Sequence, residues 1–203
     1  PVEGAKAGLP KRRKLVKHHK PLGYSEIPIL VLAVRHSAAK SMSKCALEFL
    51  ILGVSRTKEV RGALWDEIDQ AKKLWVVPAS RMKGADPHRV PLGERMLEIL
   101  SQTKALAPHS QLAFPNPTTG KPLSENTMLF LLQKRLRFDA TVHGVRLAFK
   151  DWAAETTEFS NDVSEMALAH TISNRFEAAY RRGDLLEKRR QLMLEWERFV
   201  CGH

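Results

Sequence analysis

The stretch TVHGVR, residues 141–146, opens the part of the chain in which helical patterns dominate. From there to the C-terminus, the sequence predicts helices over about 142–156, 162–169, 173–182 and 184–200. The last of these is amphipathic and has large aromatic residues near its end. We therefore expect the C-terminal third of the chain to be helical throughout.

Upstream of that stretch, helical patterns alternate with one hairpin pattern. Ser37–Val54 is the strongest expected helix, because its apolar residues recur at spacings of three and four. Leu74–Val77 and Arg89–Leu92 are short β-rich runs, and the polar loop between them contains Gly and Pro, which predicts a β-hairpin. The other expected elements are helices over 24–34, 57–64, 94–106 and 127–136 and a brief strand over 112–114. The predicted fold class is mainly α with a small antiparallel β-sheet or hairpin.

The charge of the chain is concentrated at its N-terminus. The chain has 203 residues and a formal net charge of +11. Residues 1–20 contain seven Lys or Arg and one Glu, which is a net +6, and show almost no apolar periodicity. We interpret them as a flexible basic linker or tail and residues 21–203 as one domain. Within the tail, the residues expected to contact DNA are Lys11, Arg12, Arg13 and Lys14; a solubilising tail is the alternative.

Several protein classes are excluded or disfavoured by the composition. No apolar run approaches the roughly 20 residues of a membrane span, and the first residues lack the apolar core of a signal peptide. Cys45 and Cys201 are the two cysteines, far apart in the sequence. A disulfide framework or a cysteine-based zinc site is therefore not expected, and a reducing compartment is the default.

Four short segments contain polar residues that are uninformative singly but specific in combination. In chain order these are Arg56 with Glu59, Lys83 on the hairpin, His143 with Arg146, and His170 followed ten residues later by Tyr180. In this order they make the chain resemble the tyrosine recombinases, most closely the catalytic domain of prophage and genomic-island integrases. The resembling segments are 55–69, 81–83, 88–92, 141–146, 167–170 and 178–185. The resemblance runs from about Tyr24 to the end of the chain.

Phosphodiester chemistry explains why arginine and histidine belong in such a set. In-line attack on phosphorus builds charge on the nonbridging oxygens, so fixed cations around them accelerate the reaction. Arginine suits this task because its planar fork contacts two oxygens and stays protonated. We expect Arg56 and Arg146 to hold the phosphate. His143, at the start of the same helix as Arg146, would accept the proton of the nucleophile or donate to the phosphate.

The remaining roles are those that the resemblance implies. Tyr180 would be the nucleophile that forms a covalent 3′-phosphotyrosyl intermediate, and a phenol with an intrinsic pKa near ~10 needs cations or a base nearby. Lys83 would be the general acid that protonates the leaving 5′-hydroxyl. His170 would donate a hydrogen bond to the phosphate. Glu59 would hold the Arg56 guanidinium in place.

The resemblance also implies partners and a place of action. The family acts on double-stranded DNA attachment sites to integrate or excise a prophage or genomic island. It assembles as a tetramer on paired sites and can use DNA-bending and directionality proteins. We expect no cofactor, no metal, no membrane association and a bacterial cytoplasmic location. The family's upstream arm-binding and core-binding domains are expected to be absent from this chain.

Other functions remain open from the sequence. Within the same chemistry, a related tyrosine transposase or a type IB-like topoisomerase would use these residues. A non-catalytic DNA-binding module would use only the cations, and a plain structural domain would use none of them. A two-metal nuclease is disfavoured because the carboxylates are not grouped. The helix over 184–200 would either pack on its own domain or, as the resemblance suggests, dock on a neighbouring protomer.

Overall fold

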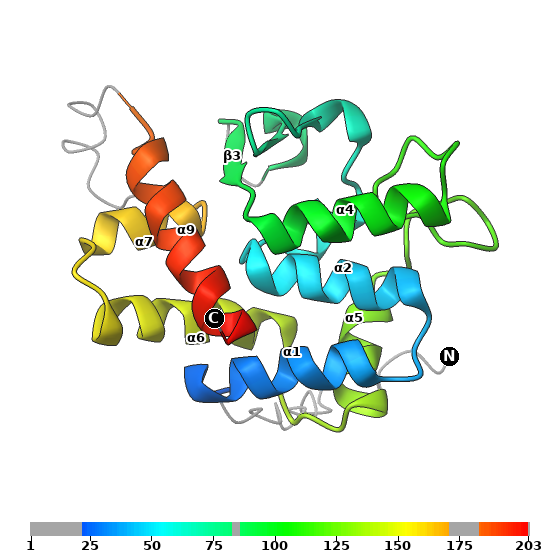
Figure 1. The fold of residues 1–203 in the computed structure, drawn as a ribbon, viewed down its shortest axis with the longest axis horizontal. Helices are drawn as coiled ribbons and strands as arrows, with labels where there is room; N and C mark the ends of the chain where they lie inside the picture. The colour runs from blue at the N-terminus through cyan, green and yellow to red at the C-terminus, as the bar shows by residue number, and fades with distance from the viewer. Residues whose placement is uncertain (1–21, 83–85, 171–182, 203) are drawn as a thin grey trace, which may run out of the picture.

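The structure is mainly helical, with one small sheet at one end (Figure 1). It is a computed structural model that describes residues 22–82, 86–170 and 183–202. The α-helices are α1 (Ile27–His36), α2 (Ser41–Leu52), α3 (Thr57–Arg61), α4 (Glu94–Leu106), α5 (Thr127–Phe130), α6 (Val142–Thr156), α7 (Asn161–Ala167) and α9 (Leu186–Cys201). Shorter 3-10 segments are η1 (Tyr24–Glu26), η2 (Trp65–Glu67) and η3 (Ala79–Arg81), and η4 (Leu131–Arg135) is a π-helical turn. The predicted fold class is confirmed.

The sheet has three antiparallel strands in the order β1 (Ile68–Asp69), β2 (Leu74–Val77) and β3 (His88–Pro91). The expected hairpin is β2 with β3, in a register that places Trp75 opposite Val90. The prediction of a strand over 112–114 is wrong. Leu112 makes an isolated bridge with Leu64, and the Ala113 N–H donates to the Ala63 carbonyl at 2.8 Å.

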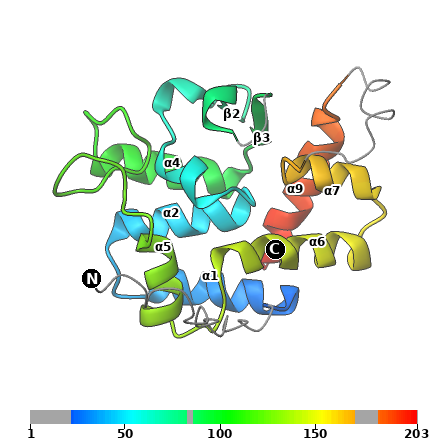
Figure 2. The ribbon, with the colours of Figure 1, turned by 180° about the vertical axis from the view of Figure 1, so that it is seen from behind.

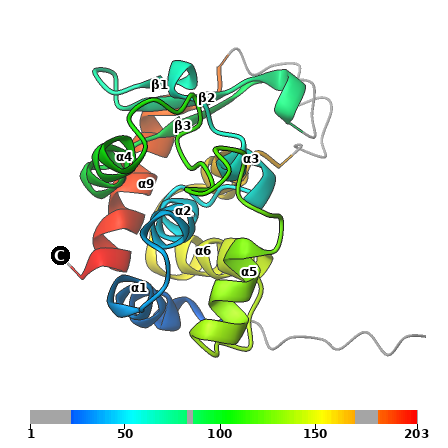
Figure 3. The same ribbon diagram turned by 90° about the vertical axis from the view of Figure 1, so that its right-hand side faces the viewer.

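Helix α2 forms the centre of the core. Every residue from Cys45 to Leu52 is buried, including Glu48. A helix buried all round must be covered on several sides, and α1, α4, α5 and α9 all pack against α2. Phe49 brings the sheet into the same core, because its ring lies 5.5 Å from that of Trp75. Figure 3 shows α2 between the sheet above it and α1 below it.

Helix α9 packs on its own domain. Trp196 is fully buried, and its indole N–H donates to the Ile51 carbonyl of α2 at 3.0 Å. The same ring packs edge-on against Phe149 of α6, with a centroid distance of 5.3 Å. Figure 2 shows α9 beside α6 and α7. Within one chain the structure therefore shows the local arrangement, and docking of this helix on a neighbouring protomer stays a prediction.

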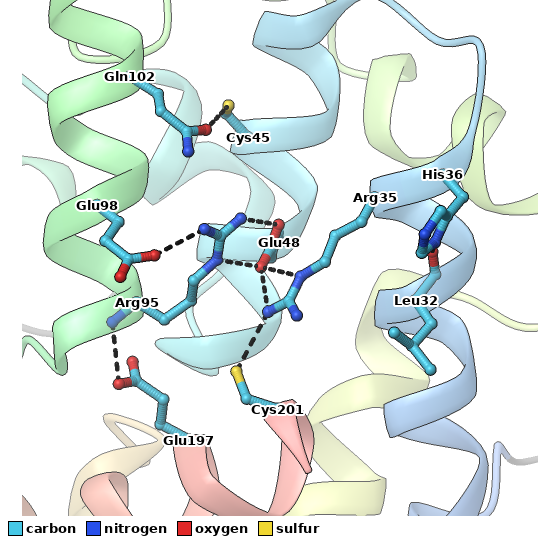
Figure 4. A network of polar contacts seen from close by, with 10 residues as sticks. All are labelled: Leu32, Arg35, His36, Cys45, Glu48, Arg95, Glu98, Gln102, Glu197 and Cys201. Atoms are coloured by element: carbon cyan, nitrogen blue, oxygen red, sulfur yellow. Dashed lines mark hydrogen bonds and ion pairs between the residues drawn. The ribbon is translucent and has the colours of Figure 1, made fainter. Parts of the chain in front are cut away.

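A buried carboxylate ties α9 and its neighbours together (Figure 4). Glu48 of α2 is 3 % exposed and accepts hydrogen bonds at 2.8 Å from Arg35 of α1 and from Arg95 of α4. Arg35 also donates to the Cys201 sulfur of α9 at 3.2 Å. Removing one partner of a buried ion pair is costly, so this network fixes four helices relative to one another. A pocket of about 280 Å³ opens beside it, and none of the predicted site residues lines that pocket.

Several helix boundaries differ from the prediction. The helix expected from residue 37 begins at Ser41, because Ser37 is the extended C-cap residue of α1; Lys44 donates to the carbonyls of Arg35 and Ser37 in that turn. The helix expected over 24–34 starts as a 3-10 turn and continues to His36. The helix expected over 127–136 is split into α5 and the π-helical turn. The helix expected over 173–182 lies outside the described residues.

None of the described helices is long and apolar enough to cross a membrane.

Candidate active site

Arg56 is held where the chain leaves α2 and enters α3. It is the N-cap residue of α3 in extended geometry, and its backbone N–H donates to Glu59 at 2.7 Å. This is half of a capping box, in which the N3 carboxylate returns to the N-cap amide. The other Glu59 oxygen accepts from the Arg56 guanidinium at 2.8 Å. Glu59 is 3 % exposed, so one buried carboxylate fixes both the backbone and the side chain of Arg56.

Arg146 lies on the buried face of α6. Thr141 caps that helix by accepting from the Gly144 N–H at 3.0 Å. The Arg146 side chain is buried and donates to the carbonyls of Val54 and Leu168. Burial, followed by the charge of Arg56, lowers the pKa of Arg146 to about 10. The two guanidiniums are thus close enough to repel each other, and an anion bound between them would relieve that repulsion.

Both arginines converge on the turn that follows α7. Arg146 Nη2 donates to the Leu168 carbonyl at 2.6 Å, and Arg56 Nη2 donates to the Ala169 carbonyl at 3.1 Å. Ala169 has a φ of +49°, and Val54 has a φ of +43°. Such left-handed geometry is costly for side chains with a Cβ, most of all for a β-branched one. The backbone is therefore strained at two residues whose carbonyls accept from the arginines, which is a common property of functional sites.

His170 joins the same group from the end of that turn. Its Nε2 lies 3.2 Å from Arg146 Nη2, and its Nδ1 lies 2.6 Å from a Glu165 oxygen. The other Glu165 oxygen lies 2.5 Å from the Lys150 amine. Burial alone would raise the pKa of Glu165, but the hydrogen bonds and charges of Lys150 and His170 outweigh it and lower that pKa. An ionised Glu165 accepts a hydrogen bond from Nδ1–H, which leaves Nε2 as the nitrogen that lies beside Arg146.

Three members of this group were not predicted from the sequence. Glu165 and Lys150 lie on α7 and α6 and meet only through the packing of those helices. His88 lies at the start of β3, within the resembling segment 88–92, where no role was predicted for it. Burial and then the charges of Arg189, Arg56 and Arg146 lower the pKa of His88 to about 3. At neutral pH His88 is therefore an uncharged polar group, near enough to Arg56 and Arg146 for their charges to act on it.

The other predicted residues lie apart from this group or outside the described residues. His143 is exposed on the first turn of α6. It is three residues from Arg146 on the same helix, but the Arg146 side chain is buried. Lys83, Tyr180 and the tail with Lys11, Arg12, Arg13 and Lys14 lie outside the described residues, so their roles remain predictions. Within the three ranges that the structure describes, no group of three or more His, Cys, Asp or Glu is placed to hold a metal ion.

We expect Glu165→Gln to slow DNA cleavage about tenfold, or ~1.4 kcal/mol in the barrier. The amide keeps the size of the side chain but removes the charge that orients His170 against Arg146. The measurement is the single-turnover cleavage rate at saturating DNA. Glu158→Gln is the matched control, because Glu158 is exposed and lies beyond the end of α6. Equal rates for the two variants would remove Glu165 from the site.

Comparison with known proteins shows the family to which this fold belongs. The Phage integrase family model matches residues 22–183. The chain belongs to that family. The prophage integrase IntA of Escherichia coli K12 is 33 % identical over 177 residues, which cover 86 % of this chain and 43 % of IntA. The chain thus spans less than half the length of this relative.

Solved structures show the same fold. The integrase of mycobacterium phage Brujita matches with a TM-score of 0.65 at 18 % identity, over 96 % of this chain and 66 % of that one. A lambda integrase tetramer bound to a Holliday junction matches with a TM-score of 0.57 at 16 % identity, over 81 % of this chain and 48 % of that one. The predicted resemblance to the catalytic domain of integrases is therefore confirmed at the level of family and fold.

Proposed function

We propose that this chain is the catalytic part of a site-specific DNA recombinase that cleaves and rejoins strands through a tyrosyl intermediate. The observation that carries the proposal is the convergence of Arg56 and Arg146 beside His170, with a fixed carboxylate behind each of Arg56 and His170. Such an arrangement presents preorganised donors to one anionic group. Residues 21–203 would form the catalytic domain, and residues 1–20 a basic linker that adds phosphate contacts.

The cleavage step transfers one phosphoryl group. The Tyr180 oxygen attacks phosphorus in line, the bond from phosphorus to the 5′ oxygen breaks, and a 3′-phosphotyrosyl bond forms. Arg56 and Arg146 stabilise the charge on the nonbridging oxygens, and His170 donates to the same group. His143 accepts the phenol proton, and Lys83 gives a proton to the departing 5′ oxygen. Because one ester replaces another, the bond energy is conserved and a second strand can reverse the step.

The substrate and the assembly follow from the same proposal. The DNA would be a double-stranded attachment site, and strand exchange would require four copies on two sites. The lambda integrase tetramer on a Holliday junction supports such an assembly. Integration or excision of a prophage or genomic island, with accessory DNA-bending and directionality proteins, would be the biological setting, and the bacterial cytoplasm the location.

A nicked suicide substrate tests the proposal. DNA flanking the gene supplies the candidate attachment site, and a nick close to the cleavage position lets the short leaving strand diffuse away. We expect an SDS-resistant protein–DNA adduct that forms equally well with EDTA present. Binding without an adduct would favour the non-catalytic DNA-binding module. Relaxation of any supercoiled plasmid, without preference for the flanking DNA, would favour a type IB-like topoisomerase. Joining of the cleaved DNA to unrelated target sequences would favour a transposase.

Lys83→Ala separates acid catalysis from DNA binding. We expect the variant to cleave normal DNA at least 100-fold more slowly, because the 5′ oxygen then leaves without a proton. Most of the rate should return on a substrate whose 5′ bridging oxygen is replaced by sulfur, since a thiolate leaves without a proton. The measurement is the single-turnover rate on both substrates. Equal defects on the two would assign Lys83 to binding instead.

A further inference from the structure

An ionic cluster around one buried arginine joins the start of α9 to the sheet. Arg189 is 2 % exposed, and it donates to the Asp184 carbonyl at 2.7 Å and to the Arg89 carbonyl of β3 at 2.6 Å. It also bonds to the Asp184 carboxylate. Arg89 reaches that carboxylate through two nitrogens, one of them at 2.7 Å. Asp184, Arg89 and Arg189 are called the Asp184 cluster below.

The cluster is costly to build. Two guanidiniums share one carboxylate, and burial lowers the pKa of Arg189 although Asp184 opposes that shift. Burial would raise the pKa of Asp184, but its bonds to Arg89 and the charges of both arginines outweigh it and lower that pKa. A buried ion pair of this kind is weak support for stability but can specify one arrangement of the chain. Leu185, the next residue, has a φ of +52°, so the turn into α9 is also strained.

The position of the cluster in the sequence connects it to the proposed chemistry. Asp184 is four residues after Tyr180, and Arg89 is six residues after Lys83. A chain of four residues spans at most about 14 Å, so anchoring Asp184 limits how far Tyr180 can lie from β3. The charges of Arg56 and Arg146, which would hold the phosphate, act on His88, the neighbour of Arg89, and help to lower its pKa. The Asp184 carboxylate thus links the segment that follows Tyr180 to β3, the strand that follows Lys83.

We propose that the Asp184 cluster positions Tyr180 for attack on the phosphate held by Arg56 and Arg146. The proposal rests on the function proposed for Tyr180 and Lys83. Asp184, Arg89 and Arg189 are positioning residues, because they act through the chain and the strand and not by contact with the DNA. Loss of the cluster should therefore slow attack by Tyr180 while phosphate binding and activation persist.

The test compares two nucleophiles at one phosphate. In the chain with Tyr180, Asp184→Ala should lower the single-turnover rate of adduct formation at least tenfold, with the half-saturating DNA concentration within twofold. In a Tyr180→Phe background, hydrogen peroxide replaces the phenol and releases the 5′-hydroxyl strand without an adduct. There, Asp184→Ala should change the peroxide-driven rate by less than twofold.

Controls keep the outcomes distinct. Asp184 is partly exposed, so its removal disturbs folding less than removal of Arg189 would. Arg189→Lys keeps the charge but loses the planar guanidinium, so it should also slow adduct formation and leave the peroxide-driven rate unchanged. Arg190→Ala, on the same helix turn and outside the cluster, should leave adduct formation within twofold. An unchanged adduct rate in Asp184→Ala would overturn the proposal. A higher half-saturating DNA concentration with an unchanged plateau rate would also overturn it. Equal losses of rate with the Tyr180 phenol and with peroxide as nucleophile would do so too. An adduct formed by Tyr180→Phe alone would instead overturn the proposed function.

Discussion

Tyr180→Phe should abolish covalent attachment to DNA while leaving DNA binding and thermal stability unchanged. The substitution removes one oxygen, which is the atom that would attack phosphorus, and keeps the ring. Tyr24→Phe is the matched control, because Tyr24 is the only other tyrosine and its hydroxyl donates to Glu155 at 2.9 Å. The measurement is adduct yield on the suicide substrate after denaturing electrophoresis. An adduct from Tyr180→Phe at the yield of the unchanged chain would contradict the assignment.

Arg146→Ala should slow cleavage by two orders of magnitude or more, which corresponds to ~3 kcal/mol or more of lost transition-state stabilisation. Arg56→Ala should do the same, because both guanidiniums converge on one turn. Removing Arg146 also takes its donor from the Val54 carbonyl and leaves the Leu168 carbonyl with only the longer bond from Arg56 at 3.4 Å, so Arg146→Lys is measured beside it. Lysine keeps the charge but cannot reach both carbonyls and a phosphate at once.

The control for this pair is Arg198→Ala, which removes an exposed arginine of α9. We expect it to cleave at the rate of the unchanged chain. The measurement is single-turnover cleavage at saturating DNA, with a thermal melt for each variant. If a folded Arg56 or Arg146 variant cleaves at a near-normal rate, that arginine does not bind the phosphate.

The elements that the sequence predicted well are those determined by local patterns. The hairpin of β2 and β3 was predicted because its two apolar runs and polar loop are adjacent in the chain. Long-range contacts were not predictable in this way. The segment over 112–114 has the composition of a strand, but its backbone pairs with the loop at Ala63 and Leu64 and not with the sheet, so it forms an isolated bridge.

The same division applies to the site. Glu59 was predicted with Arg56 because the resemblance pairs the two residues one turn apart, and the structure shows two bonds between them. Glu165 and His88 were not predicted, because each reaches the arginines through tertiary packing. His170 reaches Arg146 only because the chain turns through left-handed geometry at Ala169, and alanine gives no signal of such a turn.

The most direct test of the central claim is to identify the residue that carries the DNA. The adduct trapped on the suicide substrate is digested with trypsin, and the peptide that retains the nucleotide is sequenced by mass spectrometry. Cleavage after Arg175 and Arg181 should give the peptide FEAAYR, residues 176–181, joined through Tyr180 to a 3′-phosphate. A nucleotide on any other residue, or a link to a 5′-phosphate, would contradict the account.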